Sequence, residues 1–347
     1  MSFYFISIIL IKSSEMLLSK EVIFIFKDLI KKYNLYYTVK ANSNIENIKI
    51  LEKKYNNNLN YAISCIEHFK ILEKLNINPQ KICLINIFSP LSSYEYLYLK
   101  GVRFFVFDDY LLMKNFLKNK NDSSLKISIR VSLTSIFNDE NIRDLGTTIK
   151  DSSKMIKYLK ENNIQYGISI YFPDYYKNRQ CEIYKCLKDE YNFISLGGIR
   201  DFKILENIEK RVDSINLEVG ELLVNTLCNK KTKIIRIKDF NNKKLVVIDE
   251  SIYFGLLDKY IKYKIFDIYL SAKYKLYTKK IKDGLKIYLY GNSGNVDDYI
   301  GEFYIEKSAK QDLCVGNCIL IKNTGAYCDE LITKYGQDLR KDKDYEI

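Results

Sequence analysis

Lys40 is the residue of this sequence whose surroundings best suit covalent chemistry. It follows a run of β-branched and aromatic residues at 35–39 and precedes the turn-forming segment Ala-Asn-Ser-Asn. Lysine is almost never fully buried unless it is paired or takes part in chemistry. An amine that loses part of its water also loses proton affinity, and the neutral amine can condense with a carbonyl. The alternative for Lys40 alone is a side chain that extends from a strand end into water.

Three further positions, like Lys40, stand where a predicted strand ends. Arg130, the pair Gly197-Gly198 and Glu218 each stand at the end of a short run of strand-forming residues. A glycine pair lets backbone N–H groups approach a phosphate at the start of a helix, although such a pair alone usually marks only a turn. Glu218 and Arg130 also suit an ordinary ion pair, because a buried carboxylate needs a cationic partner.

Eight short apolar runs alternate with amphipathic stretches over the first two thirds of the chain. The runs predict strands at 35–39, 59–63, 82–85, 104–107, 127–131, 166–171, 193–196 and 214–218. The stretches between them predict helices at 45–55, 66–75, 94–100, 110–118, 153–162, 181–189 and 202–210. This alternation predicts a (β/α)8 barrel, in which the C-terminal ends of the strands carry the chemistry. The four positions described above all occupy such ends.

The pattern changes after Glu218, where strands replace helices. Predicted strands lie at 234–237, 244–248, 268–272, 285–289, 303–306 and 318–322. Turn-forming segments such as Lys282-Asp-Gly and Gly291-Asn-Ser-Gly separate them. We therefore predict a fold of the α/β plus β class: a TIM-like barrel followed by a β-sandwich or β-barrel domain.

The composition is that of a globular protein and favours neither a nucleic-acid nor a membrane partner. The 347 residues are 47% hydrophobic and 28% charged, with a net charge of +12. The basic residues are scattered and form no stripe interleaved with aromatic residues. The apolar segment at 2–11 lacks a basic start and a small-residue cleavage site, and it is too short to span a bilayer. We therefore expect a cytoplasmic protein.

The cysteines and the single histidine form no metal or disulfide pattern. Eight cysteines are spread along the chain, without the density of a disulfide scaffold. Cys314 and Cys318 are the closest pair and lie far from His68 in the sequence, so no zinc site is expected. His68 falls in a predicted helix, where a surface or packing role is expected.

The segment around Lys40 resembles the lysine motif of the fold-type III pyridoxal-phosphate decarboxylases, the group of ornithine, diaminopimelate and arginine decarboxylases. The family motif Tyr-x-Val-Lys-Ala-Asn is matched at 37–42. The resemblance covers nearly the whole chain, since this family joins a barrel to a β-domain that also takes the N-terminal strand, here expected at 3–6. It implies a barrel at 12–226 that binds pyridoxal phosphate (PLP), and a β-domain made of 1–11 and 227–347. It also implies that Lys40 holds PLP as a Schiff base.

Other single residues and short segments match cofactor-binding positions of the family. Arg130 corresponds to an arginine that supports the cofactor's acidic partner, and that partner corresponds to Glu218. The pair Gly197-Gly198 resembles two residues of a Gly-Gly-Gly phosphate loop, and Tyr327 ends a Gly-Ala-Tyr segment whose tyrosine lies near the phosphate. A carboxylate such as Glu218 keeps the pyridine nitrogen protonated, and the ring then draws electrons from the α-carbon. The resemblance therefore implies loss of CO2, whereas the alanine racemases of this fold type have an arginine there.

The phosphate-binding positions differ from the family pattern in part. Tyr171 replaces a histidine that stacks on the cofactor ring, and a tyrosine can still stack. Pro173-Asp174 stand where the family has a Gly-Ser pair that contacts the phosphate. Glu221 replaces the arginine of the family segment Glu-Pro-Gly-Arg.

The substrate-binding positions also differ. Gly294 and Asn295 stand where the family has a cysteine and an aspartate, which come from the second subunit of a head-to-tail dimer. Asp298, or its neighbour Asp297, is then the acid left to meet a substrate amine.

The resemblance implies PLP-dependent decarboxylation of an ornithine-, diaminopimelate-, lysine- or arginine-like amino acid. It also implies a homodimer with active sites at the interface and a place in polyamine or lysine biosynthesis. Two alternatives stay open. A catalytically impaired relative could act as a binding or regulatory protein, and a racemase could act at the same α-carbon.

Overall fold

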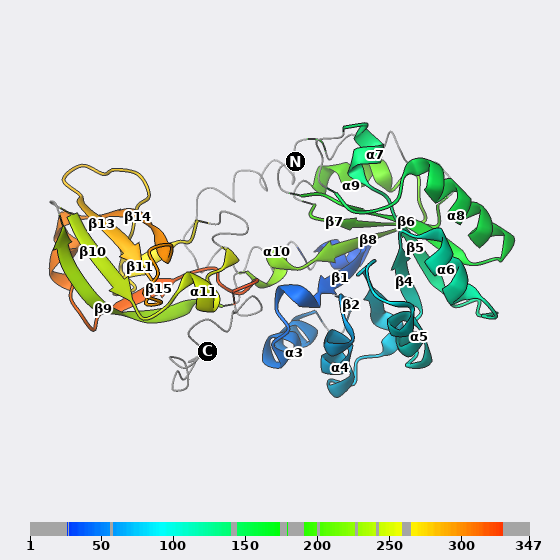
Figure 1. Ribbon diagram of the computed structural model, residues 1–347, viewed down its shortest axis with the longest axis horizontal. Helices are drawn as coiled ribbons and strands as arrows, with labels where there is room; N and C mark the ends of the chain where they lie inside the picture. Colours follow the sequence, from blue (N-terminus) through cyan, green and yellow to red (C-terminus); the bar gives the residue numbers. More distant parts are fainter. Residues whose placement is uncertain are drawn as a thin grey trace. The chain divides into compact units, whose positions relative to one another are not determined.

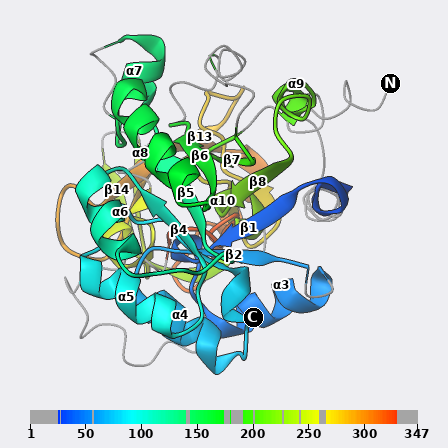
Figure 2. The ribbon, with the colours of Figure 1, turned by 90° about the vertical axis from the view of Figure 1, so that its right-hand side faces the viewer.

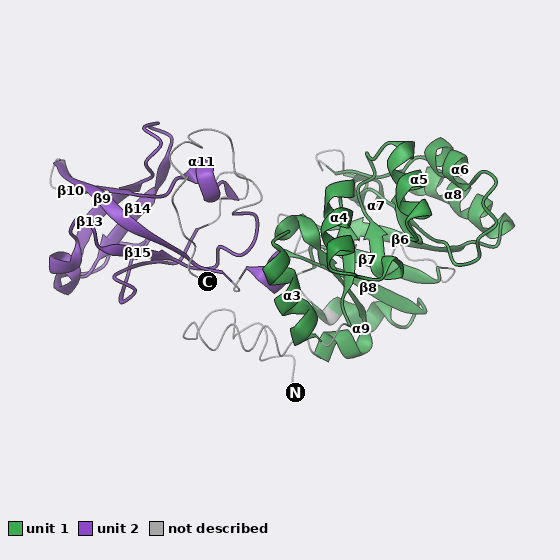
Figure 3. Cartoon of the chain, turned by 90° about the horizontal axis from the view of Figure 1, so that it is seen from below, with its two compact units in different colours: residues 1–220 green, residues 221–347 purple. Residues whose placement is uncertain are grey.

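The computed structural model forms two compact units, residues 1–220 and 221–347 (Figure 3). It describes residues 26, 28–55, 58–139, 144–173, 179, 191–199, 202–225, 228–240, 243–258 and 265–328. The strand expected at 3–6 and the helix expected at 181–189 lie outside the described residues. The domain boundary expected at 226 stays a prediction, and each unit is described by itself below.

The first unit is a closed barrel of eight parallel strands, which confirms the predicted (β/α)8 class (Figure 1). The strands follow one another in chain order, and the last pairs with the first. Their bounds are β1 Asn34–Thr38, β2 Asn60–Ile63, β3 Ile82–Leu84, β4 Phe104–Phe107, β5 Lys126–Arg130, β6 Gln165–Tyr171, β7 Phe193–Gly197 and β8 Ser214–Val219. Because all eight strands are parallel, their C-terminal ends meet at one end of the barrel, which we call the barrel mouth.

Helices lie outside the ring of strands (Figure 2). They are α3 Ile45–Lys54, α4 Ile66–Lys74, α5 Leu91–Leu99, α6 Tyr110–Leu117, α7 Leu133–Phe137, α8 Ile149–Glu161 and α9 Leu205–Ile208. The side chains of Asn44, Asp109 and Thr148 accept backbone N–H groups at the starts of α3, α6 and α8. These caps satisfy donors that a helix end leaves unpaired. Helix α7 was not predicted, because a segment this short shows no helical period.

Apolar side chains fill part of the barrel interior. Phe104 of β4 meets Tyr36 of β1 and Phe193 of β7, with ring centres 5.6 and 5.2 Å apart. These strands are not neighbours, so their side chains can meet only across the inside of the barrel. Ala62 and Cys83 belong to the same cluster.

Polar side chains face the interior on β5 to β8. Ser128, Ser169, Ser195 and Asn216 are buried, and Asn216 donates to the Ser195 hydroxyl at 3.1 Å. The hydroxyls of Ser128 and Ser169 make no hydrogen bond of ordinary geometry within the described part of the chain. Since an unsatisfied buried hydroxyl costs free energy, these two are expected to meet water or a bound molecule.

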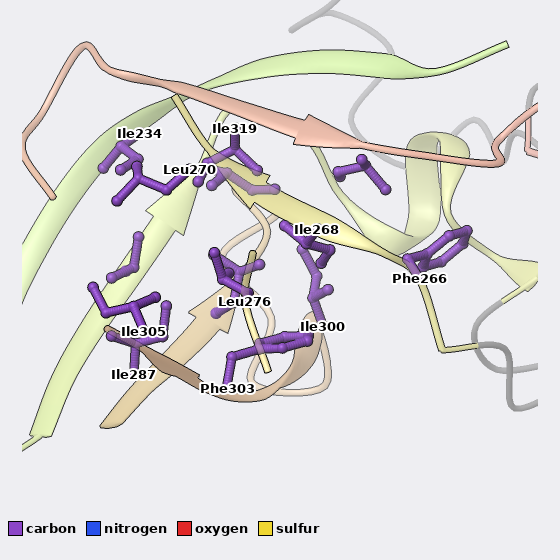
Figure 4. Close-up of a cluster of buried hydrophobic side chains, with 14 of the residues drawn as sticks. Ile234, Phe266, Ile268, Leu270, Leu276, Ile287, Ile300, Phe303, Ile305 and Ile319 are labelled. Atoms are coloured by element: carbon purple, nitrogen blue, oxygen red, sulfur yellow. The ribbon is translucent and has the colours of Figure 1, made fainter. Parts of the chain in front are cut away.

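The second unit is a seven-stranded mixed sheet with the order β12-β11-β15-β9-β10-β13-β14. Its strands are β9 Lys230–Phe240, β10 Lys243–Ile248, β11 Ile268–Leu270, β12 Tyr274–Lys275, β13 Leu285–Tyr290, β14 Tyr299–Ile305 and β15 Cys318–Ile321, with the short helices α10 Glu221–Val224 and α11 Ile252–Gly255. Aliphatic side chains such as Ile234, Leu270 and Ile305 form its core (Figure 4). All six predicted strands are present, and among the described residues of this unit the strand that was missed is the two-residue β12.

The described residues contain neither a membrane-spanning helix nor a metal-binding cluster. In the ranges given above, no helix has the length and apolar character needed to cross a membrane. Within the same part of the chain, no group of three or more His, Cys, Asp or Glu side chains is arranged to hold a metal ion.

Candidate active site

Lys40 lies in a single 3-10 turn, Val39–Ala41, directly after β1. Val39 and Ala41 are fully buried, whereas the Lys40 side chain is exposed. The two buried neighbours hold the turn, so the amine extends from a fixed point at the barrel mouth. The sequence led us to expect a partly buried amine at Lys40, and the exposed side chain differs from that expectation. The reason is that β1 ends at Thr38, and the turn carries Lys40 past the buried layer.

Gly220 supports this turn from the end of β8. A Cβ atom at Gly220 would lie 3.1 Å from the Cβ atoms of both Thr38 and Ala41. Such a distance is shorter than almost all real contacts of a Cβ atom. A larger residue at 220 would therefore push the Lys40 turn away from β8 by a few tenths of an ångström.

Glu218 is a partly buried carboxyl on β8 that lies close to two cations. Burial raises the pKa of Glu218 above its ordinary value, while the charges of Arg130 and Lys40 and the hydroxyl of Ser169 act in the opposite direction. Burial is the largest of these effects, so the pKa stays raised. A carboxyl with a raised pKa among cationic partners is typical of a functional site, although structural ion pairs also produce it.

Arg130 ends β5, and its guanidinium lies near an aromatic ring and two carboxyl groups. Its Nε is buried and makes no hydrogen bond within the described part of the chain. The guanidinium carbon lies 5.5 Å from the centre of the Tyr171 ring, within the range of a cation–π contact. Burial also raises the pKa of Asp108, and the charge of Arg130 opposes that rise. Arg130 therefore acts on the carboxyl groups of both Asp108 and Glu218.

Gly197 is the point where the ring of Tyr171 and the carboxyl of Glu218 converge. A Cβ atom at Gly197 would lie 2.9 Å from Cδ2 of Tyr171 and 3.2 Å from Oε2 of Glu218. Strand pairing sets this arrangement, because Gly197 is the register partner of both Tyr171 and Glu218. The Tyr171 side chain is 41% exposed, so its ring stays accessible at the barrel mouth.

Gly198 occupies a position that only glycine fits. Its φ is +72°, and a Cβ atom there would lie 2.0 Å from the carbonyl oxygen of Phe172. The helical residues that follow begin at Phe202 with a 3-10 turn and continue into α9. The glycine pair thus makes a close turn against the end of β6.

We expect Gly198→Ala to destabilise the barrel strongly. Alanine at positive φ and the collision with Phe172 together cost about 3 kcal/mol, which lowers the melting temperature by roughly 6–12 °C. Gly294 is a matched control, because its φ is +78° and a Cβ atom there would meet no other atom within 4 Å. Gly294→Ala should cost only about 1 kcal/mol. Thermal unfolding followed by circular dichroism compares the two, and equal losses would contradict the collision at Gly198.

Asp298 and Tyr327 belong to the second unit and are described within it. The carboxylate of Asp298 is buried and accepts backbone N–H groups from Ile252 and Ser293. Tyr327 has a φ of +59°, which is rare for a bulky side chain and costs backbone free energy. The roles predicted for Asp298 and Tyr327 stay predictions.

The positions that depart from the family pattern are placed in part. Glu221 begins α10, while Asp174 lies outside the described residues. Gly294 and Asn295 lie in the loop between β13 and β14. His68 lies in α4, and its Nδ1 accepts the backbone N–H of Ser64 at 3.3 Å.

Two polar residues of the site were missed at the level of sequence. Ser169 stands two residues before Tyr171 on β6, and residues two apart in a strand share a face. Asp108 directly follows β4, so it is an acidic residue at the C-terminal end of a barrel strand, where functional residues are expected. Both signals are present in the sequence, but only the closed barrel brings these residues to Arg130 and Glu218.

The barrel residues fit a pyridoxal group. Lys40 offers an exposed amine, and Glu218 offers a carboxyl that could face a ring nitrogen. The missing Cβ of Gly197 leaves a cradle between a carboxyl and an aromatic ring. Arg130 Nε is a buried polar atom that makes no hydrogen bond within the described part of the chain, so it still requires a partner.

The comparison with protein families identifies this part of the chain. Residues 20–172 match the family described as "Pyridoxal-dependent decarboxylase, pyridoxal binding domain". The matched range contains Lys40, Arg130 and Tyr171. A comparison by sequence alone finds no match among curated proteins.

Solved structures share the fold at low sequence identity. The arginine decarboxylase of Paramecium bursaria Chlorella virus bound to agmatine has a TM-score of 0.72 at 15% identity, over 92% of this chain and 90% of its own. The lysine decarboxylase of Selenomonas ruminantium has a TM-score of 0.74 at 15% identity, over 92% and 87% of the two chains. The lysine/ornithine decarboxylase of Vibrio vulnificus complexed with putrescine has a TM-score of 0.71 at 12% identity, over 91% and 88%.

At these identities the solved structures establish the fold, and the family match assigns the cofactor. The barrel is a pyridoxal-binding domain of the decarboxylase type. Residues 20–172 therefore match the pyridoxal-binding domain of the pyridoxal-dependent decarboxylases, and the chain shares its fold with solved arginine and lysine decarboxylases.

Proposed function

We propose that this protein holds PLP through Lys40 and removes the carboxyl group of an amino acid. One observation carries the proposal. An exposed lysine and a carboxyl of raised pKa, Glu218, lie close together at the barrel mouth of a pyridoxal-binding domain. A primary amine at this position can bond covalently to the aldehyde carbon of the cofactor.

When bound, PLP draws electrons from the α-carbon of the substrate through its protonated ring nitrogen. Glu218 would hold that proton at the nitrogen. Arg130 and Ser169 support this role, because both favour the ionised form of Glu218 against the effect of burial. Tyr171 would offer its ring face for stacking.

The phosphate is assigned to the turn at Gly197-Gly198 and to Tyr327. Glycines in a tight turn let backbone N–H groups approach an anion. Glu221 adds a negative charge where the family has an arginine, and this charge weakens the attraction for a phosphate. We therefore expect the protein to need added PLP for full occupancy.

The proposed substrate is an ornithine-, diaminopimelate-, lysine- or arginine-like amino acid. The solved structures of similar fold are named as arginine, lysine and lysine/ornithine decarboxylases. Asp298 or its neighbour Asp297 would supply the acid for a substrate amine. A homodimer with active sites at the interface, a cytoplasmic location and a place in polyamine or lysine biosynthesis complete the proposal, and the resemblance supports them.

A second candidate is a relative without catalytic activity that acts by binding. Two substitutions favour this candidate. Gly294 stands where the family has a nucleophilic cysteine, and Glu221 stands where the family has a cationic arginine. Racemisation is less well supported, because Glu218 is a carboxyl rather than an arginine.

Release of labelled CO2 tests the proposal. The PLP-supplemented protein should release CO2 from at least one of carboxyl-labelled ornithine, diaminopimelate, lysine and arginine, and heat-treated protein should release none. Protein that takes up PLP and releases no CO2 from any of these, but interconverts amino-acid enantiomers, would favour a racemase. Protein that takes up no PLP would contradict the proposal and favour the binding relative.

A further inference from the structure

The side chain of Tyr37 reaches from β1 to the turn that carries Lys40. It is fully buried. Its neighbour Tyr36 meets Phe104 inside the barrel, and successive side chains of a strand point to opposite faces, so Tyr37 points outward to the helix layer. There its hydroxyl donates to the backbone carbonyl of Asn42 at 2.6 Å. Asn42 ends the 3-10 turn and stands two residues after Lys40.

Asn42 joins this turn to the helix that follows. Its N–H donates to the carbonyl of Val39 at 3.1 Å, which closes the backbone around Lys40. Its Oδ1 accepts the N–H of Asn44 at 3.1 Å and the Nδ2 group of Asn47 at 3.2 Å. Asn44 is the N-cap of α3, and Asn42 itself is buried. A shift of the Asn42 backbone would therefore disturb both the Lys40 turn and the start of α3.

Tyr61 of β2 supports the ring of Tyr37 from the next strand. The two residues are register partners, and their rings meet edge to face with centres 6.2 Å apart, a favourable geometry for an aromatic pair. The hydroxyl of Tyr61 donates to the carboxylate of Glu52 on α3. Each of these buried tyrosines thus bonds through its hydroxyl outside the ring of strands. The hydroxyl of Tyr37 is the one of the two that bonds to the backbone of the Lys40 turn.

We propose that Tyr37 is a positioning residue for Lys40. Its hydroxyl holds the Asn42 backbone, and the closed turn between Val39 and Asn42 then presents the amine at a fixed place. Fixed placement matters because a displacement of about 1 Å can slow a reaction about 10²-fold. This inference rests on the proposed function, in which Lys40 bonds to the aldehyde of PLP.

Amide hydrogen exchange on the full-length protein tests the hold on the turn without any cofactor. In the wild type the amide of Asn42 should exchange slowly, because it is bonded to Val39 and its backbone is held by Tyr37. Tyr37→Phe should raise the exchange rate in the segment 39–44 about tenfold. Tyr61→Phe is the matched control, because it also removes one buried hydroxyl, and it should leave that segment within about twofold of the wild type. Fast exchange at Asn42 in folded wild-type protein, or equal exchange in both variants, would overturn the proposal.

The rate of PLP attachment tests the consequence for Lys40. PLP is mixed with each cofactor-free protein at a temperature where circular dichroism shows it folded, and the visible absorbance is followed in time. Tyr37→Phe should slow attachment about tenfold, whereas Tyr61→Phe should stay within about twofold of the wild type. A Tyr37→Phe protein that attaches PLP at the wild-type rate would overturn the positioning role. If the wild type attaches no PLP, the proposed function fails, while hydrogen exchange still decides whether Tyr37 holds the turn.

Discussion

Lys40→Ala is expected to abolish both the visible absorbance of the PLP-supplemented protein and its decarboxylase activity. The amine of Lys40 is the group that would bond to the cofactor, and the other two residues of that turn, Val39 and Ala41, carry no amine. Loss of such a nucleophile lowers kcat by at least about 10³-fold. The Lys40 side chain is exposed, so its removal should leave the melting temperature nearly unchanged. Absorbance spectra, CO2 release and thermal unfolding together check this expectation.

Lys49→Ala is the matched control for Lys40→Ala. Lys49 is an exposed lysine on α3 that pairs with Glu46 at 2.7 Å, and such a surface pair contributes less than about 1 kcal/mol. The Lys49 variant should keep its absorbance, activity and stability. A Lys40→Ala protein that still shows the absorbance and releases CO2 would exclude Lys40 as the site of attachment.

Glu218→Gln is expected to lower kcat by about 10²–10³-fold while PLP still binds. Glutamine keeps the shape of the side chain, but it cannot carry the negative charge that holds a proton on the ring nitrogen. Lys40 and the glycine turn are unchanged, so the absorbance should persist. Steady-state kinetics with saturating PLP measure the effect on kcat, and titration with PLP measures binding.

Glu206→Gln serves as the control for Glu218→Gln. Glu206 is an exposed glutamate on α9, so its substitution should leave kcat and PLP binding within about twofold of the wild type. A Glu218→Gln enzyme with normal kcat would contradict the role of the carboxyl in holding the proton. It would favour an ordinary structural pairing of Glu218 with Arg130.

The fold was predictable because its signals are local. Each barrel strand is a short apolar run followed by a turn or helix, and such runs show their type within a few residues. The same local pattern identified the positions at the strand ends, including Lys40, Arg130 and Glu218. Elements too short to show a period, such as α7 and β12, were missed.

The geometry of the site depends on long-range packing, and this limits what a sequence can predict. The exposure of Lys40 depends on how far β1 extends before the 3-10 turn. The contacts among Arg130, Ser169 and Glu218 depend on the closed register of β5 to β8. The buried ties of Asp298 depend on Ile252, which lies 46 residues earlier in the chain.

The covalent attachment of PLP at Lys40 is the central claim about this site, because the roles of Glu218, Arg130 and Tyr171 all depend on it. Borohydride reduction of the PLP-loaded protein, followed by proteolysis and mass spectrometry, locates any lysine bonded to the cofactor. We expect a pyridoxyl phosphate adduct on the peptide that contains Lys40, and none on that peptide without reduction. An adduct confined to other lysines, or no adduct at saturating PLP, would contradict the attachment at Lys40.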